Sequence, residues 1–370
     1  MAEPEESDWD AWMVETLRRY NDLHVFELQE PTRVLEWIQD RSICVAGYSA
    51  VRNNEIQELS LPQKLSAKDK QGLCPERDFH VERGGFSQRP VYQLKHVART
   101  SLLVSSGPPD PSLQVWQLAT DDSDAISLLT TLPCSSVVGG WSRISVTSSP
   151  TPRVLWSSTT SDLTIQEIET QSVLFSGAGA EDHEPISMLE FLDHSTFIIC
   201  SMNGRLRMAD MRQSPSLIGH SGLPSGSSCW TMALAPGFSA VGRLSLDGEV
   251  VLTDCRDLSK VLGRAELDIP RPVICSDHLS LSWAPRLPQH LAVSGFDGTV
   301  HVYDAGSWSA SPRQVQPVFI HRGHSVGAEL DHVPPLVTMH VWHPWKERVL
   351  LSAADDSSLH VWDWVAQDGT

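Results

Sequence analysis

The sequence predicts an all-β chain of seven repeats that close into a ring, and three observations support this prediction. A strand with alternating apolar residues recurs seven times along the chain. An Asp or Asn stands at a fixed distance before most of these strands. The chain then ends before its last repeat is complete, so we expect the missing strand to come from the other end of the chain.

The C-terminal segment LHVWDW (359–364) supplies the template for the recurring strand. The position of its second aromatic-bearing residue pair, the Trp before Asp, recurs at intervals of 43 to 59 residues, as expected for four-stranded units with loop insertions. The residue three positions earlier is apolar in all seven repeats, and the residue one position earlier is apolar in six. This period of two is typical of a strand with one buried face. The seven anchor residues are Leu59, Trp116, Gln166, Ala209, Thr253, Tyr303 and Trp362.

A tight turn precedes each of these strands. Six positions before the anchor, six of the seven repeats carry Asp or Asn, and Gly follows at Asn203, Asp247 and Asp297. Asn-Gly and Asp-Gly favour hairpin turns because both residues tolerate positive φ. We therefore expect another strand before each turn, as at 291–296 and 349–354.

A further strand lies upstream and ends in a turn that contains proline. Trp-Ala-Pro at 283–285 and Trp-His-Pro at 342–344 mark this turn in the last two repeats. Several short strands joined by turns at this period predict the blades of a seven-bladed β-propeller.

The repeat resembles the WD-repeat family. Gly-His pairs at 219–220 and 323–324, the Asp-Gly turns and the final Trp362-Asp363 carry the resemblance, which covers about residues 24–366. In that family a His, the turn Asp and the Trp form a buried hydrogen-bond network. The resemblance implies such a network in the last blade, and an absent or altered one where Leu59, Trp116 and Gln166 depart from the pattern. The residues that it assigns to this structural network are His324, Asp356, Trp362, Asp297, Asp247 and Asn203.

The N-terminus is expected to close the ring. The chain ends at Thr370, only seven residues past Asp363, which is too short for a turn and a strand. An unpaired strand edge invites aggregation, and HVFEL (24–28) alternates correctly to cover it. The predicted parts are an acidic tail with a short amphipathic helix at 1–22, the propeller at 23–366 with its closing strand at 23–30, and a C-terminal tail at 367–370.

The expected N-terminal helix begins at Ser7-Asp8-Trp9-Asp10, which has the signature of a helix cap. Trp9, Trp12 and Tyr20 fall on one face at helical spacing. This stripe either packs on the side of the propeller or anchors a partner, because Trp is enriched where interfaces are strongest.

Two long intervals predict loop insertions at 62–99 and 305–335, and the first is locally basic within an acidic chain. Loops on a rigid scaffold often bind partners, but surface insertions are also tolerated without any function. Both interpretations remain open. The candidate partner-binding residues are Arg77, Asp78, Phe79, Arg83, Phe86 and Arg89, together with Trp9 and Trp12.

The formal net charge of −18 argues against direct binding to nucleic acid or to anionic membranes, both of which require basic residues. It suits a basic protein partner, although it also simply keeps a large surface soluble. The seven scattered cysteines and the acidic N-terminus without an apolar core indicate a reducing compartment and no signal peptide. We therefore expect a cytoplasmic protein.

No pattern for catalysis stands out. Motifs for nucleotide binding and for a nucleophile elbow are absent from the sequence. His340 and His343, like His321 and His324, are three residues apart, as metal ligands can be. On a strand that spacing sends the two side chains to opposite faces. We expect no enzyme activity, no cofactor and no metal.

Other stretches are similar to a subgroup of WD-repeat proteins. They include RVLEWI (33–38), PERDF (75–79), GGFS (84–87) and SLHVWDWV (358–365), which lie at both ends of the chain. The resemblance implies a cytoplasmic assembly factor that holds the endonuclease heterodimer of the Integrator RNA-processing complex as a monomeric propeller in a hetero-complex. It equally implies an alternative, an adaptor for microtubules that is found at spindle poles and the cleavage furrow during division.

Overall fold

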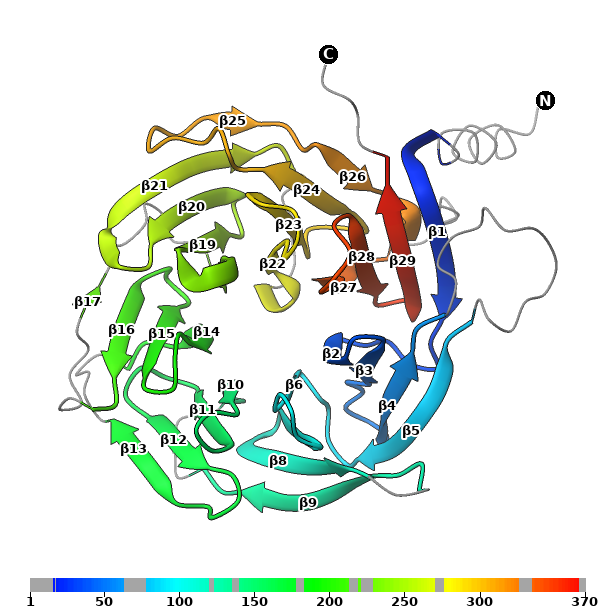
Figure 1. The fold of residues 1–370 in the computed structure, drawn as a ribbon, viewed down its shortest axis with the longest axis vertical. Coiled ribbons are helices and arrows are strands. Elements are labelled where there is room, and N and C mark those ends of the chain that lie inside the picture. The colour runs from blue at the N-terminus through cyan, green and yellow to red at the C-terminus, as the bar shows by residue number, and fades with distance from the viewer. Residues whose placement is uncertain are drawn as a thin grey trace.

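Seven β-sheets stand around a central channel like the blades of a propeller (Figure 1). Each sheet is antiparallel, apart from one short parallel strand, and its strands run from the channel outward. The predicted all-β seven-bladed propeller is therefore confirmed. The fold is a computed structural model that describes residues 16, 18–62, 78–119, 123–134, 140–177, 183–212, 219–220, 229–269, 276–325 and 335–365.

The first four blades follow one another along the chain. Blade 1 contains β2 (Glu36–Gln39), β3 (Ser42–Ala46), β4 (Asn54–Ser60) and β5 (His80–Ser87). Blade 2 contains β6 (Gln93–His96), β7 (Leu102–Gly107), β8 (Asp110–Leu118) and β9 (Ile126–Leu132). Blade 3 contains β10 (Arg143–Thr147), β11 (Arg153–Ser157), β12 (Leu163–Glu167) and β13 (Val173–Gly177). Blade 4 contains β14 (Ile186–Phe191), β15 (Thr196–Ser201), β16 (Leu206–Asp210) and β17 (Gly219–His220).

The last three blades depart slightly from this order. Blade 5 contains β18 (Trp230–Leu234), β19 (Ala240–Ser245), β20 (Glu249–Asp254), β21 (Asp257–Leu267) and the parallel β25 (Gln314–Val315). Blade 6 contains β22 (Ser280–Trp283), β23 (His290–Ser294), β24 (Val300–Asp304) and β26 (Phe319–His321). Blade 7 contains β27 (Val337–Trp342), β28 (Val349–Ala354), β29 (Ser358–Trp364) and β1 (Tyr20–Glu27).

The repeat found in the sequence matches the third strand of each blade. Each anchor residue lies in that strand, from Leu59 in β4 to Trp362 in β29. The predicted strand at 349–354 coincides with β28, and the Trp-containing Pro turns end the inner strands β22 and β27.

The core lies between the blades. The buried apolar residues in the described part of the chain form seven clusters, and each cluster joins two neighbouring blades. Both faces of a blade are thus covered, which explains why the second strands β3, β7, β19 and β28 are buried along their whole length.

The ring closes as predicted. The N-terminal strand β1 pairs with β29 in antiparallel register, with Phe26 opposite Leu359 and His24 opposite Val361. Figure 1 shows β1 in blue beside β29 in red. Closure removes the free edge that blade 7 would otherwise expose.

The structure corrects the prediction for Tyr20, which was placed on the N-terminal helix. Tyr20 is the first residue of β1 and pairs with Trp364, because hydrogen bonding to β29 outweighs its helical spacing. The rest of the predicted helix, including Trp9 and Trp12, lies outside the described residues. Within those residues the helices are short 3-10 turns at Pro236–Phe238, Ser276–His278 and Gly323–Ser325, and no helix has the length and apolar content to cross a membrane.

The two predicted loop insertions are largely strands. Segment 62–99 supplies β5 and β6, so the expected loop shrinks to 63–77, which lies outside the described residues. Segment 305–335 supplies β25, which runs along the outside of blade 5, and then β26 of blade 6. Their mixed composition hid these strands, because an outer strand needs only one buried face.

Candidate functional site

A hydrogen-bond network occupies blade 7. His324 is bonded through Nδ1 to the Ser358 hydroxyl at 2.7 Å and through Nε2 to the Ser352 hydroxyl at 2.8 Å. The Trp362 indole N–H donates to the same Ser352 oxygen at 3.2 Å. The Asp356 carboxylate accepts from the Ser358 backbone N–H and hydroxyl. The structure thus links His324, Asp356 and Trp362, with two serines between them.

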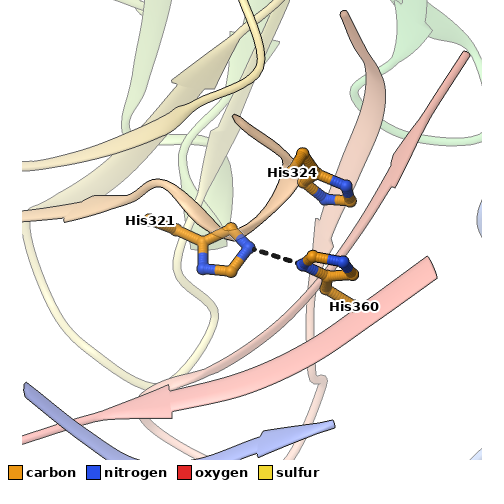
Figure 2. Close-up of side chains that lie close together, drawn as sticks. All are labelled: His321, His324 and His360. Carbon is orange, nitrogen blue, oxygen red and sulfur yellow. Dashed lines mark hydrogen bonds between the residues drawn. The ribbon is translucent and has the colours of Figure 1, made fainter. Parts of the chain in front are cut away.

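The network continues to the N-terminal strand. The Tyr20 hydroxyl lies 2.8 Å from His321 Nδ1, and His321 Nε2 lies 3.0 Å from His360 Nδ1 (Figure 2). The His321 ring also stacks on Trp362, with the ring centroids 4.6 Å apart. Because β1, β26 and β29 each contribute a residue, these bonds fasten blade 6, blade 7 and the closing strand together. We call Tyr20, His321, His324, His360 and Trp362 the closing seam.

The seam histidines are held in the neutral form. Burial lowers the pKa of His324 to about 3 and that of His360 to about 2, and the neighbouring His324 lowers the latter further. Burial, followed by the charges of its two histidine neighbours, keeps the pKa of His321 well below its ordinary value. A proton added to any ring would also place two donors against each other.

The seam histidines were tested as a metal site, since their ring nitrogens lie within 4.8 Å of one another. His321 and His324 already use both ring nitrogens in hydrogen bonds, and His360 uses Nδ1. The His324 and His360 rings stack face to face, with centroids 3.7 Å apart at 11°. Their lone pairs lie in parallel planes and do not converge on one ion, so the geometry favours hydrogen bonding over metal binding.

The other predicted turn residues do not share one arrangement. Asp297 most resembles Asp356, because it accepts from the N–H and hydroxyl of Thr299, which in turn bonds to His301. Asn203 instead pairs with a glutamate, and Asp247 is exposed while its turn is held by a serine hydroxyl. The network is therefore complete in blade 7 and altered elsewhere.

Two of the predicted partner-binding residues belong to the fold. Arg83 forms an ion pair with Glu58, whose side chain is 3% exposed, at 2.6 Å. Arg89 donates to Gln114 and to the hydroxyl and carbonyl of Ser112, and burial lowers its pKa. These interactions hold β5 and the following turn to blades 1 and 2, so neither guanidinium is a free surface group.

The remaining predicted residues are spread out. Phe79 packs edge-on against Phe26 of the closing strand, with centroids 4.5 Å apart. Phe86 is 64% exposed on β5, and Asp78 is exposed beside Phe79. Trp9, Trp12 and Arg77 lie outside the described residues. Phe86 is thus the clearest surface residue of the predicted set.

A different site lies where the channel opens, at the N-terminal ends of the inner strands. Here a cavity of about 470 Å³ is lined by residues of several blades. The Arg33 guanidinium lies 4.0 Å from the Tyr92 ring centroid, and the Arg143 guanidinium lies 3.6 Å from that of Trp141. We call Arg33, Tyr92, Trp141, Arg143 and His278 the channel mouth.

Charged groups also lie deeper in the channel, but they pair with one another. The Lys95 amino group lies 3.6 Å from a carboxylate oxygen of Glu36, which raises the pKa of Lys95. Burial raises the pKa of Glu190, which accepts a hydrogen bond from Ser145 at 2.8 Å. A lysine that holds its proton this firmly is not a nucleophile, and the Ser145 oxygen already accepts the Phe191 N–H. These contacts favour a structural role.

Comparison with known proteins identifies the family. No protein-family model matches the chain. A Xenopus laevis protein named Integrator complex assembly factor WDR73 is 45% identical over 372 residues, which cover 97% of this chain and 100% of the relative. Proteins of the same name from Danio rerio and Homo sapiens are each 43% identical, over 96% of this chain and 96% and 97% of their own lengths. The chain belongs to the WDR73 family.

Sequence reasoning missed several residues of this WDR73-family propeller. His360 lies two positions before Trp362 and therefore on the same face of the strand, which was a usable signal. Arg33, Tyr92 and Arg143 lie at or just before an inner strand, so aligning the repeats at that strand would have grouped them. The stacking between them depends on side-chain packing, which no repeat pattern encodes.

Proposed function

We propose that this WDR73-family chain is a non-catalytic scaffold that helps to assemble the Integrator complex by binding its endonuclease heterodimer in the cytoplasm. The shared name of the relatives carries the proposal, because the alignments cover nearly the whole length of both proteins. A ring of seven blades with a core at every junction supports it as a rigid surface for protein partners.

Charge provides the mechanism. The cleft of an RNA-cutting enzyme must be basic to hold phosphates, whereas this chain has a formal net charge of −18. Opposite charge steers the two proteins together. An acidic propeller over such a cleft also shields the active site until assembly is complete.

Salt tests the electrostatic part. The purified chain is incubated with the recombinant endonuclease heterodimer, and binding is measured by interferometry from about 0.1 M to about 1 M salt, which shortens the Debye length from about 10 Å to about 3 Å. We expect binding at low salt and a steep loss as salt rises. Binding that barely changes would contradict charge steering, and no binding at any salt would contradict the proposed function.

A surface variant tests the blade 1 face. Charge reversal of Arg83 or Arg89 would report on folding, because both are tied into the fold. Phe86→Ser is the cleaner probe, and Val173→Ser, at a residue 58% exposed on the outer strand of blade 3, is its control. If Phe86 lies in the interface, only the first variant weakens binding, and equal effects would remove Phe86 from it.

A further inference from the structure

The channel mouth contains two arginines that lack an acidic partner. The Arg33 guanidinium donates one hydrogen bond, to the Asp277 carbonyl, and the Arg143 guanidinium donates one, from Nε to the Ser187 carbonyl at 2.8 Å. Among the described residues neither forms an ion pair with a carboxylate. Since a guanidinium carries five N–H donors, most of the donors in this pair remain available.

A row of aromatic rings holds the two guanidinium groups in place. Arg33 lies over Tyr92, Tyr92 meets Trp141 edge-on with centroids 5.3 Å apart, and Arg143 lies over Trp141. Stacking on a ring fixes the plane of a guanidinium while leaving its edge free to donate. The two forks are therefore oriented before any ligand arrives.

A third unpaired polar group lines the same cavity. The Nδ1 atom of His278 is buried and has no hydrogen-bond partner among the described residues. Burial, with Arg33 next, lowers the pKa of His278 to about 4, so its ring is neutral and can donate one N–H. Buried polar groups without partners are uncommon in folded proteins and require an explanation.

The charges at the mouth define the ligand. Arg33 and Arg143 lie close enough for the charge of Arg33 to disfavour the charged form of Arg143, whose pKa burial lowers to about 10. Asp277 is the acidic group that opposes this effect. Two positive charges and one negative charge are balanced by a single negative charge. We infer that the channel mouth binds one carboxylate, presented by an acidic peptide segment of a protein partner.

A carboxylate fits better than a phosphate. Both match the fork of a guanidinium, but a phosphate carries nearly two negative charges at pH 7. Asp277 lies at the mouth, and Glu36 and Glu190 lie deeper in the same cavity, so a second negative charge would be repelled. The aromatic walls suit the apolar part of a peptide side chain.

This inference deepens the proposed function and rests on it only for the identity of the partner. If the partner belongs to Integrator, the mouth receives a carboxylate from one of its chains. The two ideas are tested separately, because the titration described next needs only the purified propeller and no Integrator subunit.

The titration uses short peptides and ¹⁵N-labelled protein. One probe, acetyl-Gly-Ser-Glu-Ser-Gly-amide, carries an internal carboxylate, and acetyl-Gly-Ser-Ser-Gly carries only a terminal one. Acetyl-Gly-Ser-Gln-Ser-Gly-amide is neutral, and inorganic phosphate is the competing anion. We expect the carboxylate peptides to shift the Trp141 indole and Arg143 Nε resonances with a dissociation constant on the order of 1 mM. Whichever of the two binds more tightly identifies the source of the carboxylate.

Variants locate the binding. Arg33→Gln and Arg143→Gln should each weaken binding about tenfold, and Arg143→Lys, which keeps the charge but loses the fork, should lie between them and wild type. Arg256→Gln removes the same charge from a side chain that is 85% exposed elsewhere, and should bind like wild type. Equal binding of the neutral peptide, tighter binding of phosphate, or an equal loss in Arg256→Gln would each overturn the inference.

Discussion

The closing seam and the channel mouth both gather polar side chains around aromatic rings, yet they differ in how their donors are used. At the seam, five of the six ring nitrogens of His321, His324 and His360 have hydrogen-bond partners. At the mouth, Arg33 and Arg143 each use one of three side-chain nitrogens, and both are charged.

This difference separates a structural network from a binding site. A buried neutral network that satisfies its own members stabilises one arrangement of the chain. Buried cations without a partner cost free energy, and an anion that reaches them recovers it. The seam should therefore govern the stability of the ring, whereas the mouth should govern ligand binding with little effect on stability.

Acid should weaken the seam, and this is the largest effect expected. The ordinary pKa of His is 6.5, and burial lowers that of His324 to about 3 and that of His340 to about 4. Above pH 6.5 the folded and unfolded chains are both neutral at these groups. Below it the unfolded chain binds protons that the folded chain cannot, so the free energy of unfolding falls. At pH 5 the loss is about 2 kcal/mol for each histidine, measurable as a lower guanidinium midpoint than at pH 7.

The variants of this experiment assign the acid response. His360→Gln should make stability less sensitive to acid, because it removes one seam histidine whose pKa is lowered to about 2. His278→Gln at the mouth should leave most of the response in place. A stability that stays constant between pH 7 and pH 5 would show that the buried histidines do not hold the ring together.

Removing one seam side chain should have the next largest effect. His324→Ala deletes both hydrogen bonds to Ser352 and Ser358 and leaves a small cavity, so the free energy of unfolding should fall by about 2–3 kcal/mol. His80→Ala, at an exposed residue of β5, should change it by less than about 0.5 kcal/mol. Similar unfolding curves for the two variants would place His324 outside the stabilising network.

The sequence predicted the fold well because propeller blades repeat. The seven anchors, the Asp or Asn turns and the closing strand all follow from local periodicity, and the structure has each of them. The errors arose where a strand departs from the repeat. β5 and β26 have mixed composition, and Tyr20 suits helical spacing, yet each is drawn into a sheet by an edge that needs a partner.

The candidate site was harder to predict than the fold. Arg83 and Arg89 looked like a basic surface because sequence shows charge but not partners, and Glu58 and Ser112 turned out to hold them. Arg33 and Arg143 are more than a hundred residues apart and meet only because the ring brings blades 1 and 3 to one channel. Such a meeting depends on tertiary structure.

Arg143→Gln should have the smallest effect on stability and sharpens the contrast with His324→Ala. It breaks one hydrogen bond to Ser187 and the stacking on Trp141, but it also removes a buried cation that sits near Arg33. These effects oppose each other, so the urea midpoint should move by an amount equivalent to less than about 1 kcal/mol. A loss as large as that of His324→Ala would make Arg143 a structural residue like those of the seam, because a cation that stabilises the folded chain without a ligand has no free energy left for one to recover.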